Sequence, residues 1–176
     1  MFSTNFPNHL NHKLMIRIPR ALALTSLVAT LAVLSGCLST DATGGATATV
    51  EETTFASSLG VDLTKSTRTT NGAYVRDIVV GTGALVANGQ GLNVKYSGWL
   101  SDGTPFDSNE SLSTTFLFHL GTHEVISGWD EGIPGMHVGG KRQIILPPSL
   151  AYGLYDNGPI PGNSVLVFNV TVVSAQ

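Results

Sequence analysis

Alternating apolar and polar positions mark two long segments in the second half of the chain. From Leu92 to Leu100, alternate positions carry Val94, Tyr96, Gly98 and Leu100, whereas the positions between them carry Asn93, Lys95 and Ser97. From Ser164 to Val173, one face carries Leu166, Phe168, Val170 and Val172, and the other carries Val165, Val167 and Asn169. A period of two is typical of β-strands. The pattern therefore predicts two long strands, each with one face turned towards a core.

Shorter segments of the same kind complete the predicted sheet. They are Ala73–Val80, Thr114–Leu120 and Lys141–Leu146. One short helix is expected around Trp129 to Gly132, because Pro134 limits its growth. Strands that share an apolar face need a cover, so we expect an α+β fold in which an antiparallel sheet of five or six strands curls around this helix. Its core is predicted to include Phe118, Leu120, Ile144, Leu146, Leu166 and Val170.

Residues 1–36 have the pattern of a secretion signal, in which positive charges precede an apolar stretch too short to cross a bilayer. The stretch ends in Leu34-Ser35-Gly36-Cys37, which resembles the bacterial lipobox. Cys37 is therefore predicted to be lipidated; a buried helix ending in Gly-Cys is the alternative, and Met15 is an alternative start. Leu38 after the cysteine favours the outer membrane of a Gram-negative bacterium, so we expect a lipid-anchored protein of the cell envelope that faces the periplasm.

The next segment, residues 37–70, is rich in Ser, Thr, Ala and Gly, and we interpret it as the lipidated cysteine followed by a flexible tether. Its first part, up to residue 50, has few apolar side chains to bury. Its second part leaves an alternative open, because Phe55, Leu59, Val61 and Leu63 are spaced to form one amphipathic turn against a neighbour. A single folded domain is predicted over residues 71–176.

Composition and charge exclude several kinds of chemistry. The chain has 12 acidic and 9 basic side chains, a net charge of −3 and a single cysteine. This balance argues against a nucleic-acid partner, and one cysteine forms neither an internal disulfide nor a cysteine-rich zinc site. His119 and His123 are four residues apart but flank Gly121 at a predicted strand end, so we read them as loop histidines. We expect no metal, no cofactor and no covalent nucleophile.

Aromatic and branched residues recur in a specific order along the predicted domain. The chain carries Phe106-Asp107-Ser108, then Val125-Ile126-Ser127-Gly128-Trp129, and then Ala151-Tyr152-Gly153. Over about residues 72–174, this order resembles the FKBP-type, macrolide-binding peptidyl-prolyl cis/trans isomerase domain. The resemblance implies a five- to six-stranded antiparallel half-barrel wrapped around one short helix, with a site between helix and sheet.

The resemblance also assigns the residues of that site. Trp129 would form its floor, and Asp107 would be the acidic group inside. The walls would be Tyr96, Phe106, Phe116, Val125, Ile126, Tyr152 and Phe168, and Ile160 would lie in the loop over the mouth. A buried carboxylate is costly without a partner, so we expect the Tyr96 hydroxyl to bind the Asp107 carboxylate. Glu124 would contribute its backbone carbonyl, with no role required of its side chain.

This site implies an enzyme that rotates X-Pro bonds in proline-containing polypeptides and assists the folding of envelope or secreted proteins. Macrolides of the FK506 or rapamycin type are implied as ligands. A second hypothesis is a catalytically silent module of the same fold that docks an envelope partner. A third, a lipid-anchored structural protein of the envelope, has little support in the sequence, because no large apolar or charged run lies outside the motifs.

Overall fold

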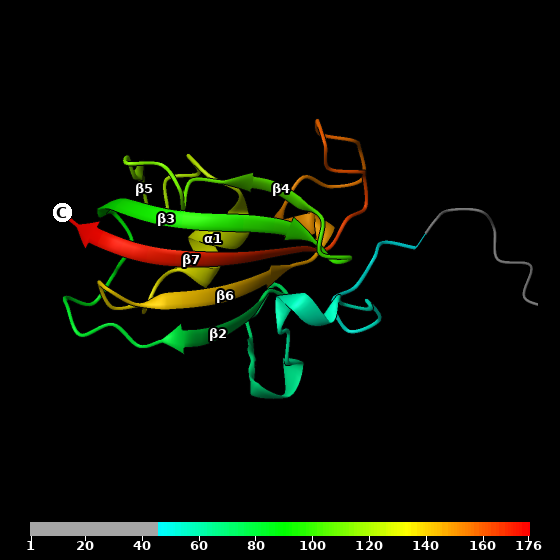
Figure 1. The fold of residues 1–176 in the computed structure, drawn as a ribbon, viewed down its shortest axis with the longest axis horizontal. Helices are drawn as coiled ribbons and strands as arrows, with labels where there is room; N and C mark the ends of the chain where they lie inside the picture. Colours follow the sequence, from blue (N-terminus) through cyan, green and yellow to red (C-terminus); the bar gives the residue numbers. More distant parts are fainter. Residues whose placement is uncertain (1–45) are drawn as a thin grey trace, which may run out of the picture. The chain divides into compact units, whose positions relative to one another are not determined.

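The computed structural model describes residues 46–176, which form one antiparallel sheet packed against a short helix (Figure 1). The strands are β1 (Thr67–Arg68), β2 (Tyr74–Val79), β3 (Gly91–Leu100), β4 (Pro105–Ser108), β5 (Phe116–His119), β6 (Lys141–Leu146) and β7 (Leu166–Ala175). The α-helix is α1 (Ser127–Gly132), and three 3-10 turns are η1 (Ser57–Leu59), η2 (Leu63–Lys65) and η3 (Pro148–Leu150).

The strand order is β1-β2-β6-β7-β3-β4, and β5 pairs with the other end of β3. All pairs are antiparallel. This confirms the predicted α+β fold, with one short α-helix among residues 46–176, although the sheet has seven strands rather than five or six. The strands missing from the prediction are β1, of two residues, and β4, which lies in the Phe106-Asp107-Ser108 motif; both are too short to show a period.

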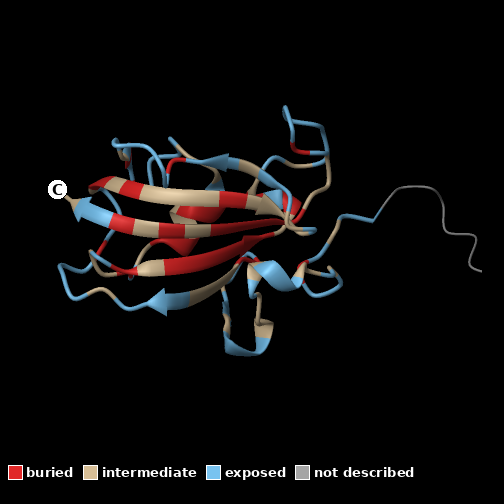
Figure 2. Ribbon diagram, viewed as in Figure 1, coloured by how far each residue is buried: buried red, intermediate tan, exposed pale blue. Residues whose placement is uncertain are grey.

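The core lies between α1 and the inner face of the sheet. Every residue predicted for it is buried: Phe118, Leu120, Ile144, Leu146, Leu166 and Val170 are 0–2% exposed. Figure 2 shows the buried positions running along β3, β7 and β6. The helix packs close because Gly128 has no side chain: a Cβ there would lie 2.3 Å from Leu146 Cδ2. This close contact sets the height of Trp129 above the sheet.

Residues 46–66, which we call the N-terminal arm, correct the prediction of a free tether over this part of the chain. The arm packs on the outer face of the sheet, where Val50 is 1% exposed and joins Ile145, Val165 and Val167. The four residues of the amphipathic alternative, Phe55, Leu59, Val61 and Leu63, pack against this cluster. The physical reason is that Val165 and Val167 give the outer face an apolar patch of its own, and such a patch also needs a cover.

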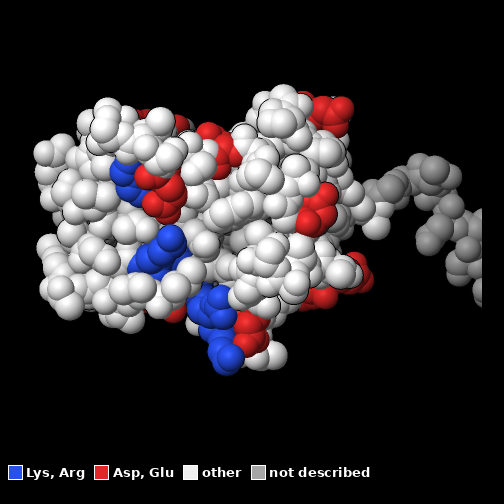
Figure 3. All heavy atoms as spheres, viewed as in Figure 1, with Lys and Arg blue, Asp and Glu red and all other residues white. Residues whose placement is uncertain are grey.

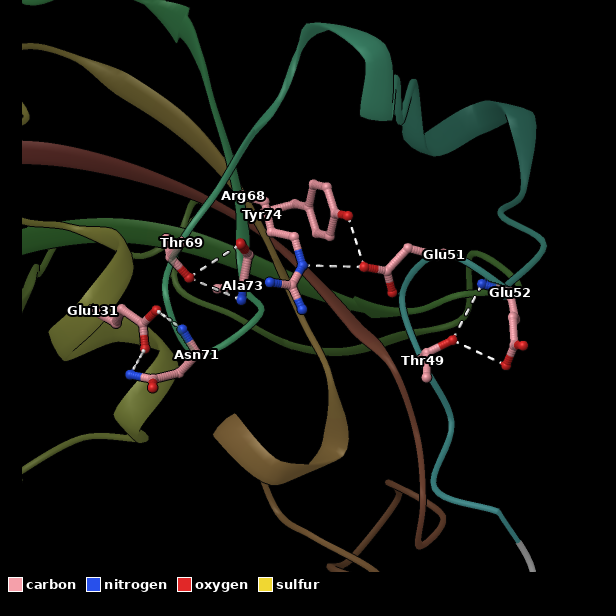
Figure 4. Close-up of polar contacts among 9 residues, drawn as sticks. All are labelled: Thr49, Glu51, Glu52, Arg68, Thr69, Asn71, Ala73, Tyr74 and Glu131. Carbon is pink, nitrogen blue, oxygen red and sulfur yellow. Dashed lines mark hydrogen bonds and ion pairs between the residues drawn. The ribbon is translucent and has the colours of Figure 1, made fainter.

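Polar contacts fasten the arm and the following turn to the domain (Figure 4). The Glu51 carboxylate accepts a hydrogen bond of 2.7 Å from the Tyr74 hydroxyl and lies 3.1 Å from Arg68 Nε. Farther along, Asn71 donates its N–H and its side-chain amide to the Glu131 carboxylate of α1. The arm is thus joined to the sheet at β1 and β2, and the turn between these strands is joined to the helix.

The predicted signal, residues 1–36, and Cys37 lie outside the described residues. Among residues 46–176, no helix combines the length and apolar character needed to span a bilayer.

Candidate functional site

A pocket of about 510 Å³ opens between α1 and the strands of the inner face. Its lining comes from β3, β4, β5, β7, α1, the loop before α1 and the turn after η3. The structure brings together ten of the residues assigned from the sequence: Tyr96, Phe106, Asp107, Phe116, Glu124, Val125, Ile126, Trp129, Tyr152 and Phe168. Tyr96 and Phe168, which are 72 positions apart in the chain, thus share one cavity.

Trp129 lies at the base of this pocket and is 4% exposed. The ring of Tyr96 stands edge-on to it at a centroid distance of 5.2 Å, and the ring of Phe168 does so at 5.5 Å. Phe106 in turn meets Phe168 edge-on at 5.5 Å. Edge-to-face contacts of this kind are favourable and hold each ring at a fixed angle. The result is a rigid aromatic cavity suited to a compact apolar ring.

One side of the pocket is polar. The Tyr96 hydroxyl donates a hydrogen bond of 2.6 Å to Asp107 Oδ2, the contact expected from the sequence. Burial raises the pKa of Tyr96, and the hydrogen bond to Asp107 raises it further. Burial, followed by the charge of Asp107, also raises the pKa of Tyr152. Both phenols therefore keep their protons at neutral pH and remain hydrogen-bond donors.

Carboxylates hold the loop that carries Val125 and Ile126. The Glu124 carboxylate accepts the His119 N–H at 2.9 Å and lies 3.0 Å from His119 Nδ1. The His119 N–H is the main reason why the pKa of Glu124 is lowered. Asp130 of α1 accepts the N–H groups of Gly121 and His123 at 2.8 and 3.1 Å. The Glu124 side chain, to which the sequence assigned no role, is therefore an anchor of the loop.

The anchored loop leaves one backbone donor for a ligand. Within residues 46–176 the Ile126 N–H has no hydrogen-bond acceptor, although the Ile126 carbonyl accepts the Trp129 N–H at 2.9 Å. The indole Nε1 of Trp129 is buried and also lacks an acceptor among the described residues. Because Ile126 lines the pocket, its N–H is a candidate donor for a ligand.

Ile160 is not among the residues that line the pocket. It is 5% exposed and packs in the main core, and its backbone pairs with Asn157. The exposed apolar side chains of its loop are instead Leu154 and Tyr155, at 57% and 85%. The sequence predicts only that Ile160 belongs to the loop over the mouth. In the structure its side chain packs in the core, and the position of its loop over the mouth stays a prediction.

Among residues 46–176, no cluster of three or more His, Cys, Asp or Glu side chains is placed to hold a metal ion.

Sequence analysis did not single out Asn109, which is 6% exposed and hydrogen-bonded to the backbone of Tyr96. A polar residue directly after the Phe106-Asp107-Ser108 motif was the available signal.

Comparisons with known proteins find the same family that the sequence motifs resemble. Residues 83–173 match the family model of FKBP-type peptidyl-prolyl cis-trans isomerases. FK506-binding protein 4 of Dictyostelium discoideum is 47% identical over 105 residues, which cover 59% of this chain and 28% of that protein. The 46 kDa FK506-binding nuclear protein of Spodoptera frugiperda is 43% identical over 106 residues, covering 60% of this chain and 26% of that protein.

Solved structures give the same picture. The crystal structure of AtFKBP13 matches with a TM-score of 0.59 and 36% identity, covering 63% of this chain and 98% of that one. FkpA from Escherichia coli matches with a TM-score of 0.59 and 32% identity, covering 64% of this chain and 52% of that one. The chain spans less than a third of the length of the curated relatives that it matches.

These relatives also correct the predicted location. Proteins at 43–47% identity come from a slime mould, the fungus Rhizopus delemar and an insect, and the insect protein is described as nuclear. They point away from an outer-membrane lipoprotein of a Gram-negative bacterium, and that prediction is wrong. It rested on Leu38 and on residues 1–36, which lie outside the matched region.

Proposed function

The chain belongs to the FKBP-type peptidyl-prolyl cis-trans isomerase family, and from this premise we propose that its pocket binds proline and catalyses rotation about X-Pro bonds. The observation that carries the proposal is the convergence of ten separately assigned residues on one cavity around Trp129. The substrates are proline-containing polypeptides, whose folding the enzyme assists.

The pocket suits this reaction because it is apolar. Rotation about an amide bond has a barrier of ~18–20 kcal/mol, which arises from resonance between nitrogen and carbonyl. Resonance places negative charge on oxygen and positive charge on nitrogen, and water stabilises this separation. An aromatic cavity removes that stabilisation from the planar amide. The twisted amide has less charge separation, so it loses less stabilisation in the cavity, and the barrier to rotation falls. Each ~1.4 kcal/mol of difference accelerates rotation about tenfold.

Two donors at the rim hold the peptide while it twists. The Ile126 N–H has no acceptor within residues 46–176, and the Tyr152 phenol is a hydrogen-bond donor whose pKa is raised by burial. Both residues line the pocket, and we expect their donors to bind substrate carbonyls. Asp107, held by the Tyr96 hydroxyl, supplies a negative charge on the polar side of the cavity.

The test is cis-to-trans isomerisation of a short Leu-Pro peptide with the full chain and with Asp107→Val and Phe168→Tyr. We expect acceleration by the wild type and a clear loss of kcat/KM in both variants at unchanged folding. The matched control is Val173→Thr, because the Val173 side chain is half-exposed on the outer face of β7. This variant is expected to retain full activity. Wild-type activity in both pocket variants would refute the site. A folded protein without activity would favour the silent binding module.

The same pocket is proposed to bind macrolides of the FK506 type, because matched relatives are described as FK506-binding proteins. A competition assay with the Leu-Pro peptide tests this. We expect FK506 to inhibit the wild type, and undiminished turnover at saturating FK506 would contradict the proposal.

Lipid attachment at Cys37 is a separate proposal that rests on the sequence motif. Metabolic labelling with a palmitate analogue is expected to mark the wild type and not Cys37→Ser. Equal labelling of both proteins would contradict it.

A further inference from the structure

The edge of β3 opposite β7 has a gap between its two partner strands, β4 and β5. β5 pairs with Gly91–Val94, whereas β4 pairs with Ser97–Trp99. Lys95 and Tyr96 fall between them. Backbone groups left unpaired in a half-buried position cost free energy, so this gap needs hydrogen-bond partners from elsewhere in the chain.

The side chain of Asn109 fills the gap. Its Oδ1 accepts the Tyr96 N–H at 2.7 Å, and its Nδ2 donates to the Val94 carbonyl at 3.1 Å. Its own N–H donates to the Tyr96 carbonyl at 3.0 Å. An amide is the side-chain group that provides an acceptor and a donor side by side, so Asn109 takes the place of a third strand. It is 6% exposed, and only two other polar residues of the described chain, Arg142 and Gln143, are classed as buried with it.

The same short segment presents the acidic group of the site. Asp107 is two residues before Asn109, and Ser108 Oγ donates to the Tyr96 carbonyl at 3.0 Å. Lys95 Nζ holds the Asn109 carbonyl at 3.1 Å and also contacts the carbonyls of Leu112 and Thr114. The backbone of Tyr96 and the segment that carries Asp107 are therefore clamped together next to their side-chain hydrogen bond.

We propose that Asn109 is a positioning residue for the Tyr96–Asp107 pair: by bonding the β3 backbone in the gap between β4 and β5, it sets the distance and angle at which the phenol meets the carboxylate. The proposal rests on the proposed isomerase function for its catalytic consequence. Its structural consequence, a fixed placement of the Tyr96 ring, does not depend on turnover.

Three single variants of the full chain test this role. Asn109→Leu keeps the size of the side chain and removes both hydrogen bonds, whereas Asn109→Asp keeps the acceptor for the Tyr96 N–H and removes the donor to Val94. Gln143→Leu is the matched control. Gln143 is 1% exposed and its amide donates to the Leu59 carbonyl at 2.8 Å, but it touches the arm rather than the pocket.

We expect Asn109→Leu to lower kcat about tenfold with a smaller change in KM, because a misplacement of about 1 Å costs up to ~10²-fold in rate. Asn109→Asp is expected to fall between this variant and the wild type. Gln143→Leu is expected to lower the urea midpoint while kcat stays at the wild-type value. If Asn109→Leu does not fold, Asn109→Asp carries the same comparison.

A double-mutant cycle separates positioning from general destabilisation. Tyr96→Phe is expected to cost less activity in the Asn109→Leu background than in the wild type, because the pair is already misplaced there. Equal fold losses in the two backgrounds, or a kcat for Asn109→Leu equal to that of Gln143→Leu, would overturn the proposal.

A spectroscopic measurement covers the case in which the wild type proves inactive. The NMR signal of Tyr96 in ¹³C-tyrosine-labelled protein, assigned by its loss in Tyr96→Phe, is expected to move in Asn109→Leu and to stay in place in Gln143→Leu. Movement without any activity would support the positioning role while refuting the proposed function. An unmoved signal in Asn109→Leu would overturn the positioning role itself.

Discussion

Gly98 lies at the point of β3 where two walls of the pocket meet, so a single added methyl group tests the packing of the site. A Cβ at this position would lie 2.7 and 2.8 Å from two ring carbons of Phe106 and 2.9 Å from a ring carbon of Phe168. Non-bonded carbon atoms prefer a separation of about 3.5–4.0 Å. Since these rings are packed edge-on against each other, both must shift to make room.

The size of the effect follows from two opposing contributions. Inserting a methylene-sized group into a well-packed core typically costs ~1–3 kcal/mol. Replacing glycine by alanine in a strand returns about 0.5–1 kcal/mol, because the unfolded chain loses conformational freedom. We therefore expect Gly98→Ala to lower the free energy of unfolding by about 1–2 kcal/mol. We also expect kcat/KM to fall by about tenfold, the equivalent of ~1.4 kcal/mol of lost transition-state binding.

Urea unfolding and peptide isomerisation measure the two effects, with Gly91→Ala as the control on the same strand. A Cβ at Gly91 would meet its nearest atom, Gln176 Cγ, at 3.4 Å, and the position does not require a positive φ. This variant is expected to be as stable as the wild type or slightly more so, with unchanged activity. If Gly98→Ala behaves like Gly91→Ala in both assays, the aromatic walls are not rigid and the packing argument fails.

Three further predictions concern the arm and the titrating groups. A fragment starting at residue 71 is expected to be at least about 3 kcal/mol less stable towards urea than one starting at residue 46. Burying a valine-sized side chain contributes ~1.5–3 kcal/mol, and the arm buries Val50 together with parts of several other side chains. Equal urea midpoints of the two fragments would contradict this. Because the pKa of Tyr96 is raised in the folded state, its contribution to stability is complete below about pH 10 and declines as the pH rises further. Tyr96→Phe is therefore expected to flatten the loss of stability at alkaline pH, and an unchanged slope of stability against pH would count against this. Hydrogen bonds from Thr64 and then from Lys65, followed by the charge of Lys65, lower the pKa of Asp62 to about 2, so its contribution to stability is present above about pH 4 and is lost as the pH falls towards 2. Acid titrations of wild type and Asp62→Asn that superimpose would rule this out.

The strands and the pocket were predictable because their signals are local. β3 and β7 are ten residues long each, and the period of two covers enough of each strand to assign most side chains to a face. The pocket residues followed from motifs in a fixed order, and the one site residue that did not reach the pocket, Ile160, came from a loop without such a motif. In that loop, the direction of a side chain depends on turns that the apolar pattern does not describe.

The arm and Asn109 were harder to foresee because their roles depend on distant parts of the chain. Val50 is buried only because Ile145, Val165 and Val167 form an apolar patch on the outer face of the sheet, which the helix does not cover. Asn109 matters because β4 and β5 stop short of each other along β3. That gap follows from the register of two strand pairs, which composition and periodicity do not contain.

The place of β7 in the sheet has a consequence for how the chain folds during synthesis. β7 is the last of the seven strands in the sequence, yet it lies between β6 and β3 at the centre of the sheet. Until residues 166–175 leave the ribosome, β3 and β6 present their inward edges without a partner. Strand pairings between such distant segments close large loops, so they form slowly. Until they form, the strand edges stay exposed without a partner. This protein therefore completes its central sheet only after nearly all of its domain has been translated, which makes the nascent domain a candidate for chaperone protection.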